Sequence, residues 1–116
     1  MYTIPTRKQE ALMFELETKN SGDKLLLILS GEMDMYYTPK FKEEALRAYE
    51  EDPKDILIDA KNLNYIDSTG LGGFIHLMNA VKQNSHTITL ADLQPNVKKL
   101  FTITKLDKLF ILQGEA

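Results

Sequence analysis

The sequence predicts a single α/β domain, with a mixed β-sheet of about five strands and three or four helices packed against it. Three observations carry this prediction. The chain has 116 residues, which suffices for one domain but not for two. Its first two strand-like segments are joined by a short turn, as in a β-hairpin. After them, strand and helix patterns alternate, as in the βα units of largely parallel sheets. We expect a loose lead-in at residues 1–11 and the domain at residues 12–116.

The hairpin is predicted from alternation and from a turn. Residues 12–18 place Leu12, Phe14 and Leu16 on one face and mainly acidic side chains on the other. This period of two predicts a half-exposed strand. "NSGD" at 20–23 has the composition of a turn, and "KLLLILSG" after it predicts a second, more buried strand.

The segment after "GEMDMYY" predicts the first helix. Thr38 is a suitable N-cap, and Pro39 then takes the first helical position, which proline favours. Apolar residues recur at helical spacing and form one stripe: Phe41, Ala45, Ala48 and Tyr49. The helix is expected to end at "EDPKD", and its run of charged residues is most simply a solvent-exposed face.

The rest of the chain continues the alternation. A short apolar run at 56–60 suits a strand covered on both faces. A second apolar stripe predicts a helix from about 70 to 83, and Pro95 opens a third helix. The last two strands are expected at 87–91, "TITLA", and at 108–112, "KLFIL".

Composition excludes several classes of function. The net charge is −3 and no basic run is present, so no nucleic-acid partner is expected, since phosphate contacts dominate that affinity. The chain has no cysteine, which removes disulfides and thiolate chemistry and suits a reducing cytoplasm. The longest apolar run, "LLLIL", is too short to cross a bilayer, and the polar N-terminal residues are unlike a signal peptide. We therefore expect a cytoplasmic protein that makes no membrane contact.

The stretch "NYIDSTGLGGFI", residues 64–75, is the most informative part of the sequence. It places Asp67 and Ser68 between a strand and a helix, before three glycines that each cost up to about 1 kcal/mol of helix propensity relative to alanine. The simple interpretation is that Ser68 or Thr69 caps the helix. Alternatively, the glycines let another surface approach closely, and the helix amides accept a phosphoryl group on Ser68. That charge would repel a partner fitted to the neutral serine.

A catalytic role for Ser68 is not expected. The esterase motif G-x-S-x-G requires glycine at position 66, which is isoleucine here. His76 lies about two turns further along the helix, roughly 12 Å from Ser68, and His86 lies in an expected surface turn. The two histidines lack the spacing of metal ligands, and "GLGG" matches neither the P-loop nor the dinucleotide fingerprint. We expect this chain to bind no metal, nucleotide or other cofactor.

A second polar motif, "GEMD" at 31–34, follows the more buried strand of the hairpin. In the simple interpretation its acid, Asp34, is an ordinary turn residue. Loops at strand ends cluster in mixed α/β sheets, so Asp34 and Asp67 could instead flank Ser68 and position it for a phosphoryl donor. Spacing alone leaves both interpretations open.

Several segments together resemble the bacterial anti-sigma-factor antagonists, which are free-standing members of the STAS domain family (sulfate transporter and anti-sigma antagonist). They are "GEMD" after a buried strand, the helix start at Thr38 and Pro39, "ILIDAKNLNYIDSTGLGGFI" and "VKKLFTITKLDKLF". The specific part is "IDSTGLG", and the resemblance covers residues 12–112. It implies a STAS-like fold. One departure is that only "QGEA" follows Leu112, where many relatives carry a further helix.

The resemblance implies a non-enzymatic protein that takes part in partner switching. Without a phosphate, it would bind an anti-sigma factor that is itself a serine kinase, and a sigma factor would be released for transcription. The kinase would phosphorylate Ser68 and the complex would then dissociate, until a phosphatase restored the serine. ATP and Mg²⁺ would belong to the kinase, so no cofactor is expected on this chain.

The resemblance also implies a role for individual residues. Ser68 matches the phosphoacceptor, Asp34 matches the acid of the first loop, and Asp67, Thr69 and Gly70 match the rest of the contact loop. Further partner-binding residues are expected on the exposed side of the second helix: Gly72, Gly73 and His76. Two alternatives stay open. One is a constitutive scaffold subunit of a transport or stress-sensing complex, in which Ser68 only caps the helix. The other is a small hydrolase.

Overall fold

The computed structural model describes residues 14–114 and confirms the predicted α/β class. The predicted lead-in and the first residues of the predicted first strand, 12 and 13, lie outside the described residues. In chain order the elements are β1 (Phe14–Ser21), β2 (Lys24–Met33), α2 (Thr38–Glu51), β3 (Asp55–Ile66), α3 (Ser68–Lys82), β4 (Ile88–Ala91), α4 (Pro95–Ile103), the short 3-10 helix η1 (Leu106–Lys108) and β5 (Ile111–Gln113).

The five strands form one mixed sheet in the order β1-β2-β3-β4-β5. β1 and β2 are antiparallel, and Ser21 pairs with Lys24, so only two residues form the turn of the predicted hairpin. The first of them, Gly22, has a φ of +67°, a conformation that glycine adopts without steric cost. The other strand pairs are parallel, which is why each is joined through a helical segment.

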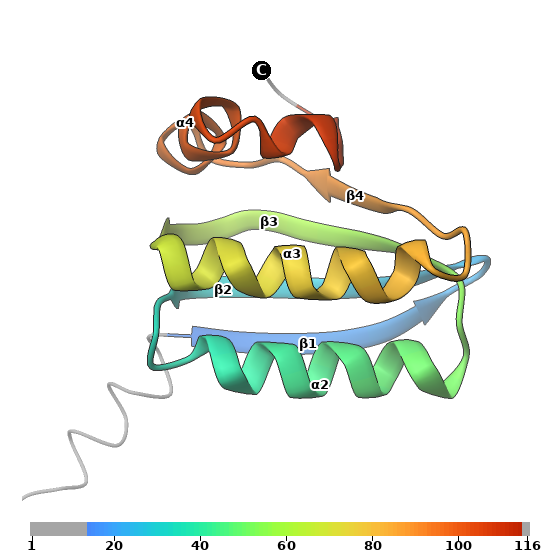
Figure 1. Ribbon diagram of the computed structural model, residues 1–116. Coiled ribbons are helices and arrows are strands. Elements are labelled where there is room, and N and C mark those ends of the chain that lie inside the picture. Colours follow the sequence, from blue (N-terminus) through green and yellow to red (C-terminus); the bar gives the residue numbers. More distant parts are fainter. Residues whose placement is uncertain (1–13, 115–116) are drawn as a thin grey trace, which may run out of the picture.

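The helices cover one face of the sheet. Connections between parallel strands through a helix are almost always right-handed. Helices that follow each other across a sheet in one direction therefore lie on the same side of it. Figure 1 shows α2 and α3 side by side on that side, with α4 beyond β4. On β2, Leu25, Leu27 and Leu29 are buried under the helices, whereas Leu26 and Ile28, on the opposite face, are half-buried.

A chain of aromatic side chains fixes α3 in the core. The ring centroid of Phe74 on α3 lies 5.2 Å from that of Phe41 on α2 and 5.6 Å from that of Phe101 on α4. Phe110, just before β5, lies 5.7 Å from Phe101. Aromatic pairs at such distances contribute about 0.5–1.5 kcal/mol each beyond their burial. The helix that carries the candidate serine is therefore held by α2 and α4 at once.

The predicted start of the first helix is wrong by one residue. Tyr37 is the N-cap of α2, although its side chain makes no capping bond, and Thr38 is already helical. The reason is the preceding turn, because the Asp34 carboxylate accepts hydrogen bonds from the amides of Tyr36 and Tyr37 at 2.9 and 3.1 Å. The Thr38 hydroxyl donates instead to the Asp34 carbonyl oxygen, at 2.6 Å.

Three other predicted bounds also shift. β3 continues to Ile66 rather than ending at residue 60, because its polar residues pair with β2 beyond the end of β4. α3 begins at Ser68, two residues earlier than predicted. The last strand begins only at Ile111, because Lys105, with a φ of +64°, opens the 3-10 turn that takes up the start of the predicted strand.

Candidate functional site

The candidate site is the junction between β3 and α3, where Asp67 caps the helix. Its Oδ1 accepts a hydrogen bond from the amide of Gly70 at 2.9 Å, and its extended backbone makes it the N-cap. Ser68 is therefore the first helical residue rather than the cap. Its side chain is exposed, and no hydrogen bond to its hydroxyl is formed by any residue in the described range. The interpretation that Ser68 or Thr69 caps the helix is wrong.

Asp67 also fastens this junction to the loop between β2 and α2. Its Oδ2 accepts a hydrogen bond from the amide of Met35 at 3.2 Å, and its own amide donates to the Met33 carbonyl oxygen at 3.3 Å. The two loops thus lie together at one end of the sheet, as their positions after neighbouring strands predict. The Asp67 carboxylate thus joins the start of α3 to the loop between β2 and α2.

Asp34 lies in the same loop, the one between β2 and α2, and stabilises its turn. Its carboxylate binds the amides of Tyr36 and Tyr37 within its own turn. No bond between Asp34 and Ser68 is formed among residues 14–114. Asp34 therefore shapes the loop next to the serine, and its effect on a phosphoryl donor stays a prediction.

The three glycines of α3 differ in their surroundings. A Cβ on Gly70 would overlap the Met33 carbonyl oxygen and lie 2.6 Å from Cγ1 of Ile66. A Cβ on Gly73 would lie 2.7 Å from Cγ2 of Thr38, whereas one on Gly72 would have nothing within 4 Å. The expectation that Gly73 lies on the exposed side of the helix is wrong, since it is buried. Gly70 and Gly73 therefore make room for the protein's own β2, β3 and α2, and of the three only Gly72 is open to another molecule.

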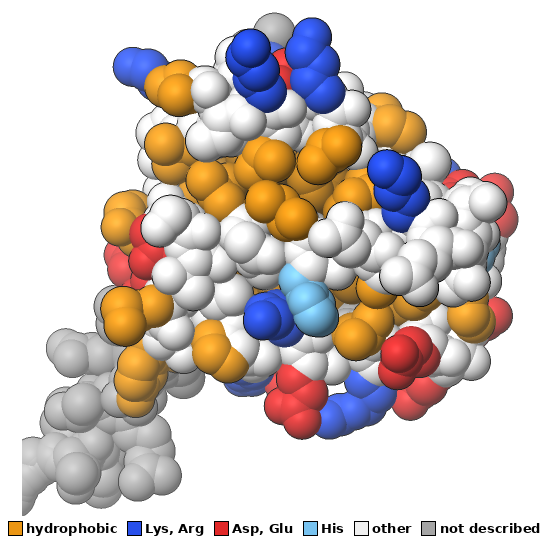
Figure 2. All heavy atoms as spheres, in the orientation of Figure 1, with side chains coloured by type: hydrophobic (Ala, Val, Ile, Leu, Met, Phe, Trp, Pro, Cys, Tyr) orange, Lys and Arg blue, Asp and Glu red, His pale blue; other side chains and the backbone are white. Residues whose placement is uncertain are grey.

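The exposed side of α3 carries almost no charge. Between Asp67 and Lys82 the sequence contains no Asp, Glu, Lys or Arg, although 27% of the chain is charged. The exposed residues of this stretch are Ser68, Thr69, Gly72, His76 and Asn79. Figure 2 shows the same face, on which uncharged side chains and an apolar patch occupy much of the centre while most charged side chains lie around it. Depletion of charge is typical of the centre of a protein–protein interface.

Two large apolar side chains beside the serine were missed from the sequence. Met35 is 73% exposed and Tyr36 is 68% exposed, both in the loop that Asp67 fastens. The sequence does carry a signal, because "MYY" places three large side chains in a loop where turns usually have small polar ones. Only the structure shows that two of them point into solvent.

Neither histidine provides a base for Ser68. His76 is exposed further along α3 and lines a groove of about 410 Å³ between α2 and α3, together with Tyr49 and Asn79. His86 directly follows the exposed turn at 83–85 and is half-buried, and its Nδ1 forms a hydrogen bond of 2.5 Å with the Tyr49 hydroxyl. The geometry gives the hydrolase interpretation no support.

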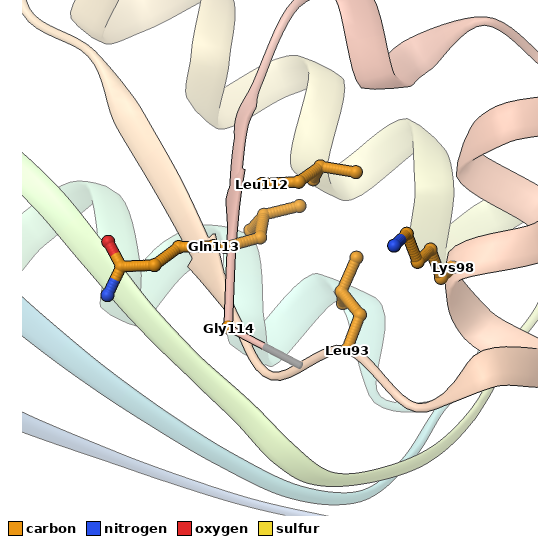
Figure 3. Close-up of a pocket in the computed structure, with 6 residues that line it drawn as sticks. Leu93, Lys98, Leu112, Gln113 and Gly114 are labelled. Carbon is orange, nitrogen blue, oxygen red and sulfur yellow. The ribbon is translucent and has the colours of Figure 1, made fainter. Parts of the chain in front are cut away.

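The expectation that this chain binds no cofactor stays a prediction. A cavity at the carboxyl ends of β4 and β5, lined by Leu93, Lys98, Leu112 and Gly114 among others, has a volume of about 50 Å³ (Figure 3). Pockets that hold small molecules typically measure about 300–1,000 Å³, so this cavity is too small for one, whereas the groove beside His76 is of that size at about 410 Å³. Within residues 14–114, no three acidic or histidine side chains are grouped so as to hold a metal ion, and no helix there is long and apolar enough to cross a membrane.

Comparison with known proteins places this chain in a family. The sequence model of the STAS domain matches residues 15–115. The anti-sigma-B factor antagonist of Staphylococcus epidermidis is 31% identical over 94 residues, which cover 81% of this chain and 87% of that relative.

Solved structures share the fold. An anti-sigma factor antagonist from Mycobacterium paratuberculosis matches with a TM-score of 0.75 at 20% identity, over 86% of this chain and 85% of that one. The phosphorylated form of SpoIIAA, a cell fate determinant of Bacillus, matches with a TM-score of 0.68 at 19% identity, over 89% and 91% of the two chains. With a family match over nearly its whole length, this chain belongs to the STAS domain family.

Proposed function

We propose that this protein is an anti-sigma-factor antagonist whose binding is switched by phosphorylation of Ser68. The observation that carries the proposal is the state of that serine. Its side chain is exposed, its hydroxyl forms no hydrogen bond to the described residues, and it is the first residue of a helix that has no Asp, Glu, Lys or Arg between positions 68 and 81. The relative from Staphylococcus epidermidis, which is named an anti-sigma-B factor antagonist, supports the class of partner.

In the unphosphorylated state, the outer side of α3 and the adjoining loop dock on the anti-sigma factor. Thr69, Gly72 and His76 are exposed there and contact the partner. Asp34, Asp67, Gly70 and Gly73 contribute indirectly, since they hold the loop and the helix start in place. The bound anti-sigma factor is no longer available to its sigma factor, which is then free for transcription. This exchange takes place in the cytoplasm.

The partner is also a serine kinase, and the chemistry belongs to it. The Ser68 hydroxyl oxygen attacks the γ-phosphorus of ATP, a new P–O bond forms, and the bond to the leaving ADP breaks. The kinase accepts the serine proton, and it supplies ATP and Mg²⁺, so this chain itself is not an enzyme. A phosphatase later hydrolyses the phosphoserine.

The phosphate is tolerated by the domain but not by the complex. The amides and dipole at the start of α3 favour a negative group on Ser68, which keeps the phosphorylated chain folded. The added charge of about −1.5 to −2 then lies beside Asp67, on a helix that carries no Lys or Arg between residues 68 and 81. Leaving such a charge unpaired in an interface costs about 2–5 kcal/mol, enough to weaken binding by a factor of about 30 or more.

The experiment uses the anti-sigma factor of the same organism, produced as a pure protein. After incubation with ATP and Mg²⁺, mass spectrometry is expected to find one phosphate, on Ser68. Ser68→Ala should bind without being released, Ser68→Asp should bind poorly, and the control Thr18→Ala, an exposed residue on β1, should be phosphorylated normally. An unmodified Ser68, combined with a stable high-order assembly in sedimentation, would favour the constitutive scaffold instead.

A further inference from the structure

The loop beside Ser68 carries the two most exposed large apolar side chains of the described residues. Six such side chains are exposed within 14–114, and Met35 at 73% and Tyr36 at 68% lead the set, which also includes Ile103 at 63% and Ile111 at 51%. Met35 and Tyr36 are adjacent in sequence, and both lie within the segment that Asp67 ties to the serine. Large apolar side chains gathered at one place on a surface mark a site of interaction.

Folding does not account for these two side chains. Their exposure means that neither contributes the stability that burial of a large apolar side chain provides. The turn itself is already closed by the Asp34 carboxylate and by the Thr38 hydroxyl. Neither residue has a positive φ, so the backbone at these positions accepts polar residues equally well.

The backbone of the loop that carries the two side chains is also held in place before any partner arrives. The Met35 amide binds Asp67 Oδ2 at 3.2 Å, and the Tyr36 amide binds Asp34 Oδ1 at 2.9 Å. The Tyr36 ring packs edge-on against Tyr37 at 5.0 Å, and the Tyr37 ring stacks on Phe14 of β1 at 5.8 Å. A preorganised loop loses little conformational freedom on binding, so contacts made by its side chains are retained as affinity.

We propose that Met35 and Tyr36 are the main affinity contacts of the docking surface, and that they insert into an apolar pocket of the anti-sigma factor. This inference rests on the proposed function, because the occupant is the same partner. The same partner is expected to contact both surfaces, because the loop continues the uncharged side of α3 past Ser68. The nearest acids, Asp34 and Asp67, are engaged with backbone amides. Methionine and tyrosine are enriched in interfaces, and tyrosine is frequent among the residues that dominate binding energy.

Affinity and switching are then carried by different residues. Met35 and Tyr36 hold the partner, whereas Ser68 contributes little until it receives a phosphate. Removing the apolar contacts is expected to weaken the unphosphorylated complex and to raise the KM of the kinase for this protein. The turnover number at saturation should stay unchanged, because the serine and its surroundings are intact.

The test compares Met35→Ala and Tyr36→Ala with a matched control, Ile111→Ala. Ile111 is also an exposed apolar residue, but it lies on β5, an edge strand separated from β2 by β3 and β4. Titration calorimetry with the pure anti-sigma factor is expected to show a rise in Kd of tenfold or more for Tyr36→Ala, the range of a dominant interface residue. A smaller rise is expected for Met35→Ala, and a change below about twofold for the control. Tyr36→Phe keeps the ring and should stay within a few-fold of the unsubstituted protein.

The outcomes separate this inference from the proposed function. Equal urea midpoints for all variants would show that the fold is unaffected. If both loop variants bound as tightly as Ile111→Ala while phosphorylation of Ser68 still abolished binding, the inference would fail and the proposed function would stand. If Ser68 were never phosphorylated and the unsubstituted protein did not bind the anti-sigma factor, the proposed function would fail and this inference with it.

Discussion

Replacing each glycine of α3 by alanine, one at a time, tests the packing of the candidate site. Alanine is favoured over glycine inside a helix by about 1 kcal/mol. At Gly72 an added Cβ meets nothing within 4 Å, so Gly72→Ala should gain this amount in full. For a domain of about this size the gain corresponds to a rise in Tm of about 4 °C.

At Gly73 and Gly70 the same gain in helix propensity is offset by steric overlap of the new Cβ with neighbouring atoms. At Gly73 the new Cβ would lie 2.7 Å from Cγ2 of Thr38, a side chain that is held by its bond to Asp34. At Gly70 it would overlap the Met33 carbonyl oxygen, which is backbone and yields less readily. Overpacking costs about 1–3 kcal/mol, so we expect a net loss at both positions, larger at Gly70.

The order of stability of these variants can be measured by urea unfolding that is monitored by circular dichroism. The expected stability order is Gly72→Ala above the unsubstituted protein, then Gly73→Ala, then Gly70→Ala. A destabilised Gly72→Ala, or a Gly70→Ala as stable as Gly72→Ala, would refute the assignment of buried and open glycines. Binding adds a second result. Gly72→Ala should bind the anti-sigma factor more weakly although it is more stable, because its new methyl group faces the partner.

Three further predictions concern residues around the serine. Asp67→Ala should lower the free energy of unfolding by about 2 kcal/mol, measured in urea, since it removes a helix cap and a bond to the loop; Asp67→Asn should lose less. Phe74→Ala should lose about 3–5 kcal/mol in the same assay, and a loss below 1 kcal/mol would contradict the aromatic core described above. Ser68→Ala should leave the urea midpoint within experimental error, because its hydroxyl bonds to no described residue; a clear loss would show that the hydroxyl stabilises the fold after all.

The local sequence pattern was sufficient to predict most of the fold. The alternation before Gly22 and the apolar stripes of the helices correctly predict the hairpin and the helices, because burial of one face imposes a period on the sequence. The cap of α3 could not be assigned this way. Asp67, Ser68 and Thr69 are all favourable caps, and only the backbone conformation selects the aspartate.

The missed features of the site depend on tertiary contacts. Gly73 follows the buried stripe of α3, three residues after Gly70 and four before Leu77, but a glycine gives no hydrophobic signal of its own. The exposure of Met35 and Tyr36 depends on how Asp67 fastens their loop, a contact across 32 residues of sequence. Ser68 itself could be singled out from the motif, and the structure adds that its side chain is exposed.

The most direct measurement is the affinity of the pure anti-sigma factor for this protein before and after phosphate is placed on Ser68. Calorimetry on the two forms, with mass spectrometry to verify a single modified serine, is expected to show tight binding of the first and a loss of at least about 30-fold for the second. Equal affinity of the two forms would contradict the account, since a charge on this exposed, uncharged surface would then not affect docking.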